Sequence, residues 1–145
     1  MFTITYATTN DIKYLCSFKA EPLSEAECIS KINDKKCYIL HFDNKVIGLM
    51  RYNFFWDFIP FLTLIYLDES YRKKGFGAKA IKHWEDEMRS LGHKLVMLST
   101  RIDIESHHFY RKLGYYDMGS IAMDNTPYKQ ALEIFMGKNL HCSTD

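Results

Sequence analysis

Residues 68–78 read DESYRKKGFGA and join a run of apolar residues to a long amphipathic one. The apolar run, 61–67, predicts a strand in the middle of a sheet. The apolar residues that follow the segment recur at helical spacing, and Gly92 then predicts the end of a helix. They are Gly77, Ile81, Trp84, Met88 and Leu91. The segment is therefore a basic, glycine-containing turn between a strand and a helix.

A turn of this kind suits an anion. The N–H groups at a helix start and the positive end of the helix dipole both favour phosphate. Gly75 and Gly77 let a ligand approach the backbone closely, and Arg72, Lys73 and Lys74 add positive charge. The glycines alone leave open a solvated basic turn in which they serve only the backbone geometry.

The turn has to be distinguished from two other known phosphate-binding motifs. The pattern G-x-x-x-x-G-K-S/T is absent from the sequence. Residues 75–80 match the loose dinucleotide form G-x-G-x-x-A, which keeps a nicotinamide-dependent oxidoreductase as an alternative. However, Ser99 and Thr100 stand where that fold needs an acidic residue, and the early hairpins do not suit a doubly wound sheet. The remaining interpretation takes residues 72–77 together as one motif, R-x-x-G-x-G.

The rest of the chain predicts a mixed α/β arrangement. Antiparallel hairpins lie early and late, and a strand-helix-strand crossover lies in the middle. Predicted strands are 2–7, 36–42, 45–53, 61–67, 94–99, 118–123 and 131–138. Predicted helices are a first one through Ile12, Leu15 and Phe18 that Thr9 or Asn10 caps, then 25–32 after the capping residue Ser24, 77–91 and 106–113.

Composition excludes several classes of protein. At 145 residues the chain is expected to form one domain, 1–145, with a single core. A hydrophobic share of 47% argues against intrinsic disorder, and a net charge of +1 argues against a nucleic-acid partner. The most apolar stretch, 53–67, is broken by Asp57 and Pro60, so no membrane span is expected.

The cysteines show no spacing suited to zinc, so no metal is expected. They are interpreted as reduced, partly buried thiols, and with no secretion signal at the start of the chain we expect a cytoplasmic protein. The four are Cys16, Cys28, Cys37 and Cys142.

Two spaced motifs carry a more specific signal. Residues 72–77, RKKGFG, match the pattern Gln/Arg-x-x-Gly-x-Gly/Ala, and residues 103–115 read DIESHHFYRKLGY. The second matches Asn-x-x-Ala-x-x-Phe-Tyr followed by basic residues, Leu-Gly and an aromatic residue. Together they resemble the GNAT family of acyl-CoA N-acyltransferases over nearly the full chain. Asp103, Ser106 and Glu69 depart from the usual Asn, Ala and Pro of that family.

The resemblance implies a GNAT-like α/β fold. Its central, mostly antiparallel sheet has about seven strands, a central strand-helix-strand crossover and flanking helices. It also implies acetyl-CoA as co-substrate, with its pyrophosphate at the basic turn and its pantetheine arm beside the strand 61–67. The implied cofactor-binding residues are Ile65, Tyr66, Leu67, Arg72, Lys73, Lys74, Gly75, Phe76, Gly77, Ala78 and Asp103.

The same resemblance implies direct attack of an amine on the thioester within a ternary complex, with no acyl-enzyme. Backbone N–H groups near Tyr66 would bind the developing oxyanion. Tyr110 matches the family tyrosine that points at the cofactor sulfur, so it is the predicted acid for the leaving thiolate. The base is left open among Asp57, Glu105, His107 and His108.

The run 52–61 holds more aromatic residues than a solvated loop needs. Asn53, Trp56 and Asp57 are predicted to contact a cationic acceptor, because such an amine suits aromatic faces and a carboxylate. The alternative is that these rings close the core or a homodimer surface. The predicted function is therefore N-acetylation of a small-molecule or peptide amine, and the alternative is a non-catalytic acyl-CoA-binding or sensory domain.

Overall fold

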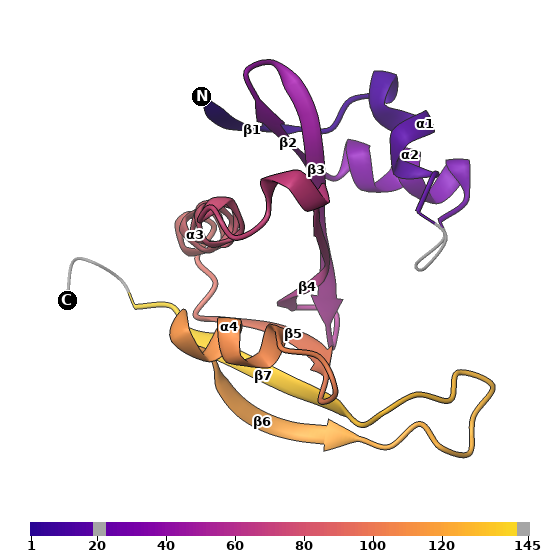
Figure 1. The fold of residues 1–145 in the computed structure, drawn as a ribbon, viewed down its shortest axis with the longest axis vertical. Helices are drawn as coiled ribbons and strands as arrows, with labels where there is room; N and C mark the ends of the chain where they lie inside the picture. The colour runs from indigo at the N-terminus through magenta and orange to yellow at the C-terminus, as the bar shows by residue number, and fades with distance from the viewer. Residues whose placement is uncertain (19–22, 142–145) are drawn as a thin grey trace. The chain divides into compact units, whose positions relative to one another are not determined.

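The structure is a computed structural model, and it describes residues 1–18 and 23–141. The chain contains both strands and helices, which are labelled in Figure 1. The strands are β1 (Phe2–Tyr6), β2 (Cys37–Phe42), β3 (Lys45–Phe55), β4 (Ile59–Leu67), β5 (Leu95–Arg101), β6 (Tyr116–Ile121) and β7 (Glu133–Asn139). The helices are α1 (Ile12–Leu15), α2 (Glu25–Asn33), α3 (Phe76–Ser90) and α4 (Ser106–Lys112), with short 3-10 turns η1 (Thr9–Asp11) and η2 (Glu69–Tyr71).

The strands form a seven-stranded sheet in the order β1-β2-β3-β4-β5-β7-β6. The pairs β1–β2, β2–β3, β5–β7 and β6–β7 are antiparallel, whereas β4 and β5 are parallel. Helix α3 connects the two parallel strands. The mixed α/β class, the mostly antiparallel sheet and the central crossover predicted from the sequence are thus confirmed.

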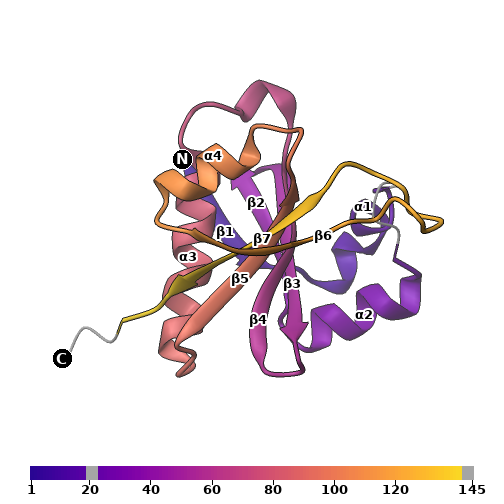
Figure 2. The ribbon, with the colours of Figure 1, turned by 90° about the horizontal axis from the view of Figure 1, so that it is seen from below.

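The chain divides into two compact units. The first unit comprises residues 1–53 and 64–81, and the second comprises 54–63 and 82–145, of which the structure describes residues up to 141. β3, β4 and α3, which are labelled in Figures 1 and 2, each begin in one unit and end in the other. The units are described separately, and the single domain 1–145 stays a prediction.

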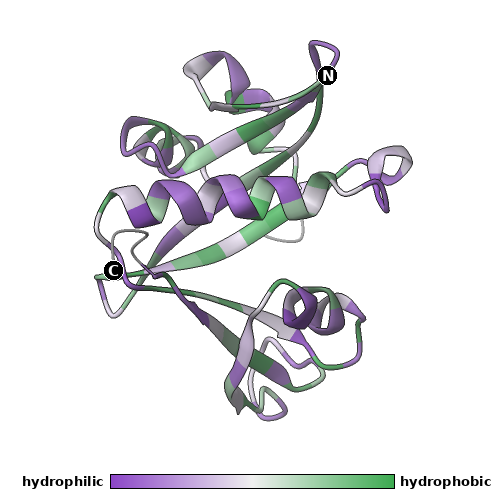
Figure 3. Cartoon of the chain, turned by 90° about the vertical axis from the view of Figure 1, so that its left-hand side faces the viewer, coloured by the Kyte–Doolittle hydropathy of each residue, from purple (hydrophilic) through white to green (hydrophobic). Residues whose placement is uncertain are grey.

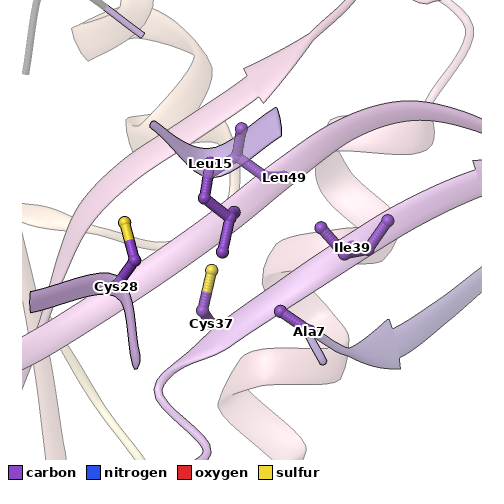
Figure 4. Close-up of a cluster of buried hydrophobic side chains, with 6 residues drawn as sticks. All are labelled: Ala7, Leu15, Cys28, Cys37, Ile39 and Leu49. Carbon is purple, nitrogen blue, oxygen red and sulfur yellow. The ribbon is translucent and has the colours of Figure 1, made fainter. Parts of the chain in front are cut away.

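The core of the first unit lies where α1 and α2 pack on β2 and β3. Figure 4 shows Leu15 from α1 and Cys28 from α2 beside side chains of the two strands. The cluster consists of Ala7, Leu15, Cys28, Cys37, Ile39 and Leu49. Burial raises the pKa of the Cys28 thiol to about 11 and that of Cys37 to about 12, so both stay protonated. Cys16 is exposed, unlike the partly buried thiol predicted, and Cys142 lies outside the described residues.

The starts of the first two helical segments are fixed by side-chain caps. Thr8 accepts a hydrogen bond from Asn10 N–H, and its own N–H donates to the Asp11 carboxylate at 2.8 Å. The prediction of Thr9 or Asn10 as the cap is therefore wrong by one or two residues, because Asp11 completes a capping box with Thr8. Ser24 accepts from Glu27 N–H, as predicted.

The aromatic run 52–61 is mostly strand rather than loop. β3 continues to Phe55 and β4 begins at Ile59, so the connection between them is short. Trp56 and Asp57 both have positive φ angles, 53° and 69°, as a tight hairpin requires. The strands extend beyond their predicted ends because the rings of Phe55 and Phe61, 6.2 Å apart, contact each other across the hairpin.

Helix α3 is amphipathic, as its spacing predicts, although Leu91, predicted on its apolar face, lies beyond its end at Ser90 and is exposed. Ala80, Ile81, Trp84 and Met88 are buried, whereas Lys79, Lys82 and Asp86 are exposed. Figure 3 shows the corresponding alternation of hydrophilic and apolar positions along this helix. No helix among the described residues is long and apolar enough to cross a membrane.

Gly48 on β3 lies directly against the backbone of the end of β4 in the first unit. A Cβ atom at this position would overlap the carbonyl oxygen of Tyr66 and crowd the Leu67 backbone. The backbone hydrogen bond from Asp68 N–H to Ile47 O, 2.7 Å long, holds the two strands together here. The position of the end of β4 therefore depends on a residue with no side chain.

We expect Gly48→Ala to lower the free energy of unfolding by about 1–3 kcal/mol, because a backbone oxygen cannot swing aside. Thermal and urea denaturation measure this loss. Gly92 offers a matched control, since its φ of 92° strains any substitution while no atom lies within 4 Å of an added Cβ. Gly48→Leu should destabilise the protein more than Gly48→Ala, whereas Gly92→Ala and Gly92→Leu should cost the same. Equal losses of stability for Gly48→Ala and Gly48→Leu would contradict the steric explanation.

Candidate functional site

The basic turn follows β4 directly in the first unit. Tyr71 N–H and Arg72 N–H donate to the carbonyls of Asp68 and Glu69, which closes η2. Lys73 and Gly75 then adopt positive φ angles of 60° and 84°. These left-handed residues reverse the chain and direct it into α3, and glycine removes the steric cost at the second of them.

The start of α3 presents backbone donors. Lys79 N–H donates to Gly75 O at 3.2 Å, so the N–H groups of Phe76, Gly77 and Ala78 precede the first helical hydrogen bond. An added Cβ at Gly75 would meet no atom within 4 Å, so the space beside the turn is open. The three basic residues before Gly75 are exposed, and the whole segment fits a phosphate group.

Aromatic packing holds this helix start in place. The Phe76 ring stacks on Phe2 at 4.7 Å with an interplanar angle of 11°, and it lies 5.4 Å from the ring of Phe42. Phe42 also contacts Tyr71 of η2 at 5.7 Å. Sequence reasoning missed these anchors, because the residues come from β1, β2, η2 and α3. The side chain of Phe76 thus packs inside the unit, and its backbone N–H is the part available to a ligand.

Arg72 connects the turn to the end of β4. Its Nε donates to Leu67 O at 2.8 Å, and its guanidinium carbon lies 5.4 Å from the centre of the Tyr66 ring. Tyr66 in turn contacts Phe18 edge-on at 4.9 Å. Ile65, Tyr66 and Leu67 are half-buried. The ladder of β4 with β5 is formed at Phe61 and Leu62, and β4 continues beyond it to Leu67.

Tyr110 lies in the second unit, on α4. It is buried, with 8% of its surface exposed, and its ring contacts Phe109 and Tyr115 at 5.3 and 5.9 Å. Within the described residues its hydroxyl has no hydrogen-bond partner. Burial raises the pKa of this phenol to about 12. Tyr110 is therefore a protonated donor throughout the neutral and mildly alkaline range.

A buried polar network supports α4 from behind Tyr110. Tyr115 Oη donates to Glu85 Oε2 at 2.8 Å, and Lys138 Nζ donates to Glu85 Oε1 at 3.0 Å. Glu85 is only 5% exposed, so the lysine compensates a buried charge. Burial and the charge of Glu85 raise the pKa of Tyr115 above its ordinary value. Glu85 and Lys138 were missed from the sequence, where each reads as an ordinary surface residue.

Comparison with known proteins decides the family. The model of the acetyltransferase (GNAT) family matches residues 6–115. The chain belongs to the GNAT acetyltransferase family. It is accordingly an acetyltransferase that uses acetyl-CoA as co-substrate. No curated protein sequence matches the chain.

Solved structures share the GNAT fold at low sequence identity. Ard1 from Thermoplasma volcanium is 17% identical with a TM-score of 0.81, over 97% of this chain and 99% of that one. The ribosomal-protein-S18-alanine N-acetyltransferase from Escherichia coli is 20% identical with a TM-score of 0.78, and the match covers 99% of this chain and 96% of that one. The putative acetyltransferase yncA from Salmonella typhimurium, solved with acetyl-CoA, is 15% identical with a TM-score of 0.73. The match covers 99% of this chain and 98% of that one.

Two residues of the second GNAT motif are engaged within the second unit. Asp103 accepts two hydrogen bonds from Arg101, at 3.0 and 2.7 Å, and these lower the pKa of its carboxyl. Arg111 Nη1 donates to His107 Nδ1 at 2.7 Å, so His107 Nε2 carries the proton and donates to Ile102 O at 3.2 Å. His107 is thereby left without a free lone pair for a base. Asp103 as a cofactor contact stays a prediction.

Asn53 lies in β3, in the first unit, whereas Trp56 and Asp57 form the turn between β3 and β4, in the second unit. All three are exposed, Trp56 to 72%. Phe55 packs against Trp56 at 4.9 Å, so the aromatic run is partly packing. The three residues stay predicted acceptor contacts of this GNAT enzyme.

Gly77→Glu should abolish detectable binding of CoA in calorimetry, because a carboxylate would occupy the open start of α3 and repel the phosphates. Ser90→Glu is the matched control, since it adds the same charge at the exposed far end of the same helix. Unchanged CoA binding by Gly77→Glu would exclude the turn as the pyrophosphate site.

Proposed function

We propose that this acetyltransferase passes the acetyl group of acetyl-CoA to a primary amine of a small molecule or peptide, by direct attack in a ternary complex. The open, basic start of α3 carries the proposal, because it supplies backbone donors, a helix dipole and exposed cations for the phosphates of CoA. The fold shared with the Escherichia coli ribosomal-protein-S18-alanine N-acetyltransferase adds support for a peptide amine.

Residues of the first unit would bind the co-substrate. Backbone N–H groups of Phe76, Gly77 and Ala78 would hold the pyrophosphate, with Lys73 and Lys74 adding charge. The backbone of Ile65 to Leu67 would pair with the amides of the pantetheine arm, as an added strand does. Arg72 would act by fixing the end of β4 relative to the turn, since its Nε is already bonded to Leu67 O.

Acetyl-CoA supplies an activated acyl group as a thioester. The amine nitrogen would form a bond to the carbonyl carbon, and backbone N–H groups near Tyr66 would stabilise the oxyanion. The carbon–sulfur bond then breaks and the thiolate takes a proton. Tyr110 would donate this proton, because its hydroxyl is neutral and free of hydrogen bonds within the described residues.

The amine must also lose a proton. Of the predicted bases, His107 is excluded by its two hydrogen bonds, whereas Asp57, Glu105 and His108 are exposed. Because these side chains are in contact with solvent, water would carry the proton away, and no single side chain is assigned as the base.

Acetyl-CoA at about 100 times its dissociation constant should raise the melting temperature by roughly 5–10 °C, whereas NAD at the same concentration should not. Differential scanning fluorimetry measures both shifts. The NAD arm tests the oxidoreductase alternative, and thiol release with a panel of amines tests the non-catalytic one. Stabilisation by NAD rather than acetyl-CoA would overturn the proposal.

Tyr110→Phe should lower kcat about 10- to 1000-fold and leave acetyl-CoA affinity unchanged. Because burial raises the pKa of Tyr110 to about 12, the wild-type enzyme should show no loss of kcat from this group between pH 7 and about pH 10, where an ordinary tyrosine begins to ionise. Tyr128→Phe, at an exposed tyrosine, is the control. Equal turnover in Tyr110→Phe and wild type would remove Tyr110 from the mechanism.

A further inference from the structure

Three aromatic rings form a mutual cluster in the second unit. Phe55 of β3, Phe61 of β4 and Phe135 of β7 lie 5.9 to 6.4 Å from one another, in stacked and edge-on contacts. All three are half-buried. The ring cluster (Phe55, Phe61, Phe135) is thus neither enclosed in the core nor scattered on the surface.

A carboxylate lies on the same side of β7 as this ring cluster. Side chains alternate along a strand, so Glu133 and Phe135 share one face while the buried Ile134 and Met136 occupy the other. The register places Phe135 opposite Ser99 of β5. Ser99 Oγ donates to Glu133 Oε2 at 2.7 Å, which bridges the two strands on the face of the rings.

Glu133 is held in place without being neutralised. Gln130 Nε2 donates to Glu133 Oε1 at 3.0 Å, so each oxygen has one neutral donor and keeps further acceptor capacity. The residue opposite Glu133 in the ladder, Arg101, forms its ion pair with Asp103 and interacts with Glu133 electrostatically only from beyond ion-pair distance. Among the described residues no cation lies within ion-pair distance of Glu133, which is itself half-buried.

Such a combination has a specific ligand chemistry. Aromatic faces attract a cation through their quadrupole, and an oriented, unneutralised carboxylate attracts it by charge and hydrogen bonding. Neutral donors on the two oxygens fix the carboxylate but leave its charge available. Glu85, a fully buried carboxylate, has the cationic partner that such a charge requires, Lys138, whereas the half-buried Glu133 has neutral donors only.

We propose that Glu133 and the ring cluster form the subsite that recognises the cationic ammonium group of the amine acceptor. This inference rests on the proposed function and gives its acceptor a chemical class. Glu133 binds the ammonium ion by charge and hydrogen bonding, and the ring faces contact the cation and the carbon atoms next to it. The predicted acceptor contact at Asp57 is the competing assignment.

A binding experiment tests the site without any acetyl transfer. Tetramethylammonium chloride is titrated into the full chain, and binding is monitored through the NMR signals of the phenylalanine rings. An uncharged probe of similar size, tert-butanol, and sodium chloride, which matches the ionic strength, serve as controls. Tetramethylammonium should shift signals of Phe55, Phe61 and Phe135, whereas tert-butanol should not. Glu133→Gln should remove these shifts.

Steady-state kinetics test the same site in turnover. Glu133→Gln should raise KM for n-butylamine about tenfold or more, with the KM for acetyl-CoA unchanged. Glu133→Asp should recover part of the loss, and Asp124→Asn, at an exposed acid, should have no effect. Phe135→Leu, which keeps apolar volume without a ring face, should raise the amine KM as well, and melting temperatures verify that each variant is folded.

Distinct results overturn each proposal. Equal shifts from tetramethylammonium in wild type and Glu133→Gln, or equal binding of tert-butanol, would refute the cation site while leaving acetyl transfer intact. An effect of Asp57→Asn on the amine KM, with none from Glu133→Gln, would move the acceptor to the hairpin. Absence of CoA binding would instead refute the proposed function, and the tetramethylammonium result would stand independently of it.

Discussion

The packing of the Phe76 ring against Phe2 and Phe42 is the contact on which the basic turn and the start of α3 in the first unit depend. The start of a helix offers useful donors only when it is rigid and open to solvent, and those two demands oppose each other. Here the first residue of α3 buries its ring against β1 and β2, while the backbone of the same turn stays open beside Gly75. Each aromatic pair contributes about 0.5–1.5 kcal/mol beyond the area it buries. The side chain of Phe76 thus anchors the start of the helix, while the backbone N–H groups of the same turn stay open to solvent.

The two units solve different electrostatic problems. In the first unit, basic side chains are exposed next to one another at the turn. One of them, Arg72, also donates a hydrogen bond to Leu67 O and lies over the Tyr66 ring. The second unit keeps a phenol neutral by burying it and supports it with the Glu85–Tyr115–Lys138 network. In the proposed function, charge attraction would serve binding in the first unit, and suppression of charge would serve proton donation in the second.

Much of the fold could be predicted from the sequence, because periodicity and turn residues are local. The helix α3, the hairpin turn at Asp43 and Asn44 and the crossover around the basic turn follow from such signals. The site was less predictable. The support of Phe76 by Phe2 and Phe42, the pairing of Glu85 with Lys138, and the pairing of Ser99 with Glu133 join residues 34 to 74 positions apart in the chain. Such contacts depend on strand order and register, which no single segment encodes.

The division of the chain also constrains how the molecule is made. Neither unit is a continuous stretch: the first needs residues 64–81 to join residues 1–53, and the second begins with the ten-residue insertion 54–63. During synthesis from the N-terminus, the first 53 residues emerge from the ribosome well before the strand end and helix start that complete their unit. The first unit therefore becomes complete only after residue 81 is released, when part of the second unit is already outside. Folding of the two units is consequently interleaved in time, because the first unit cannot be completed before the beginning of the second has been synthesised.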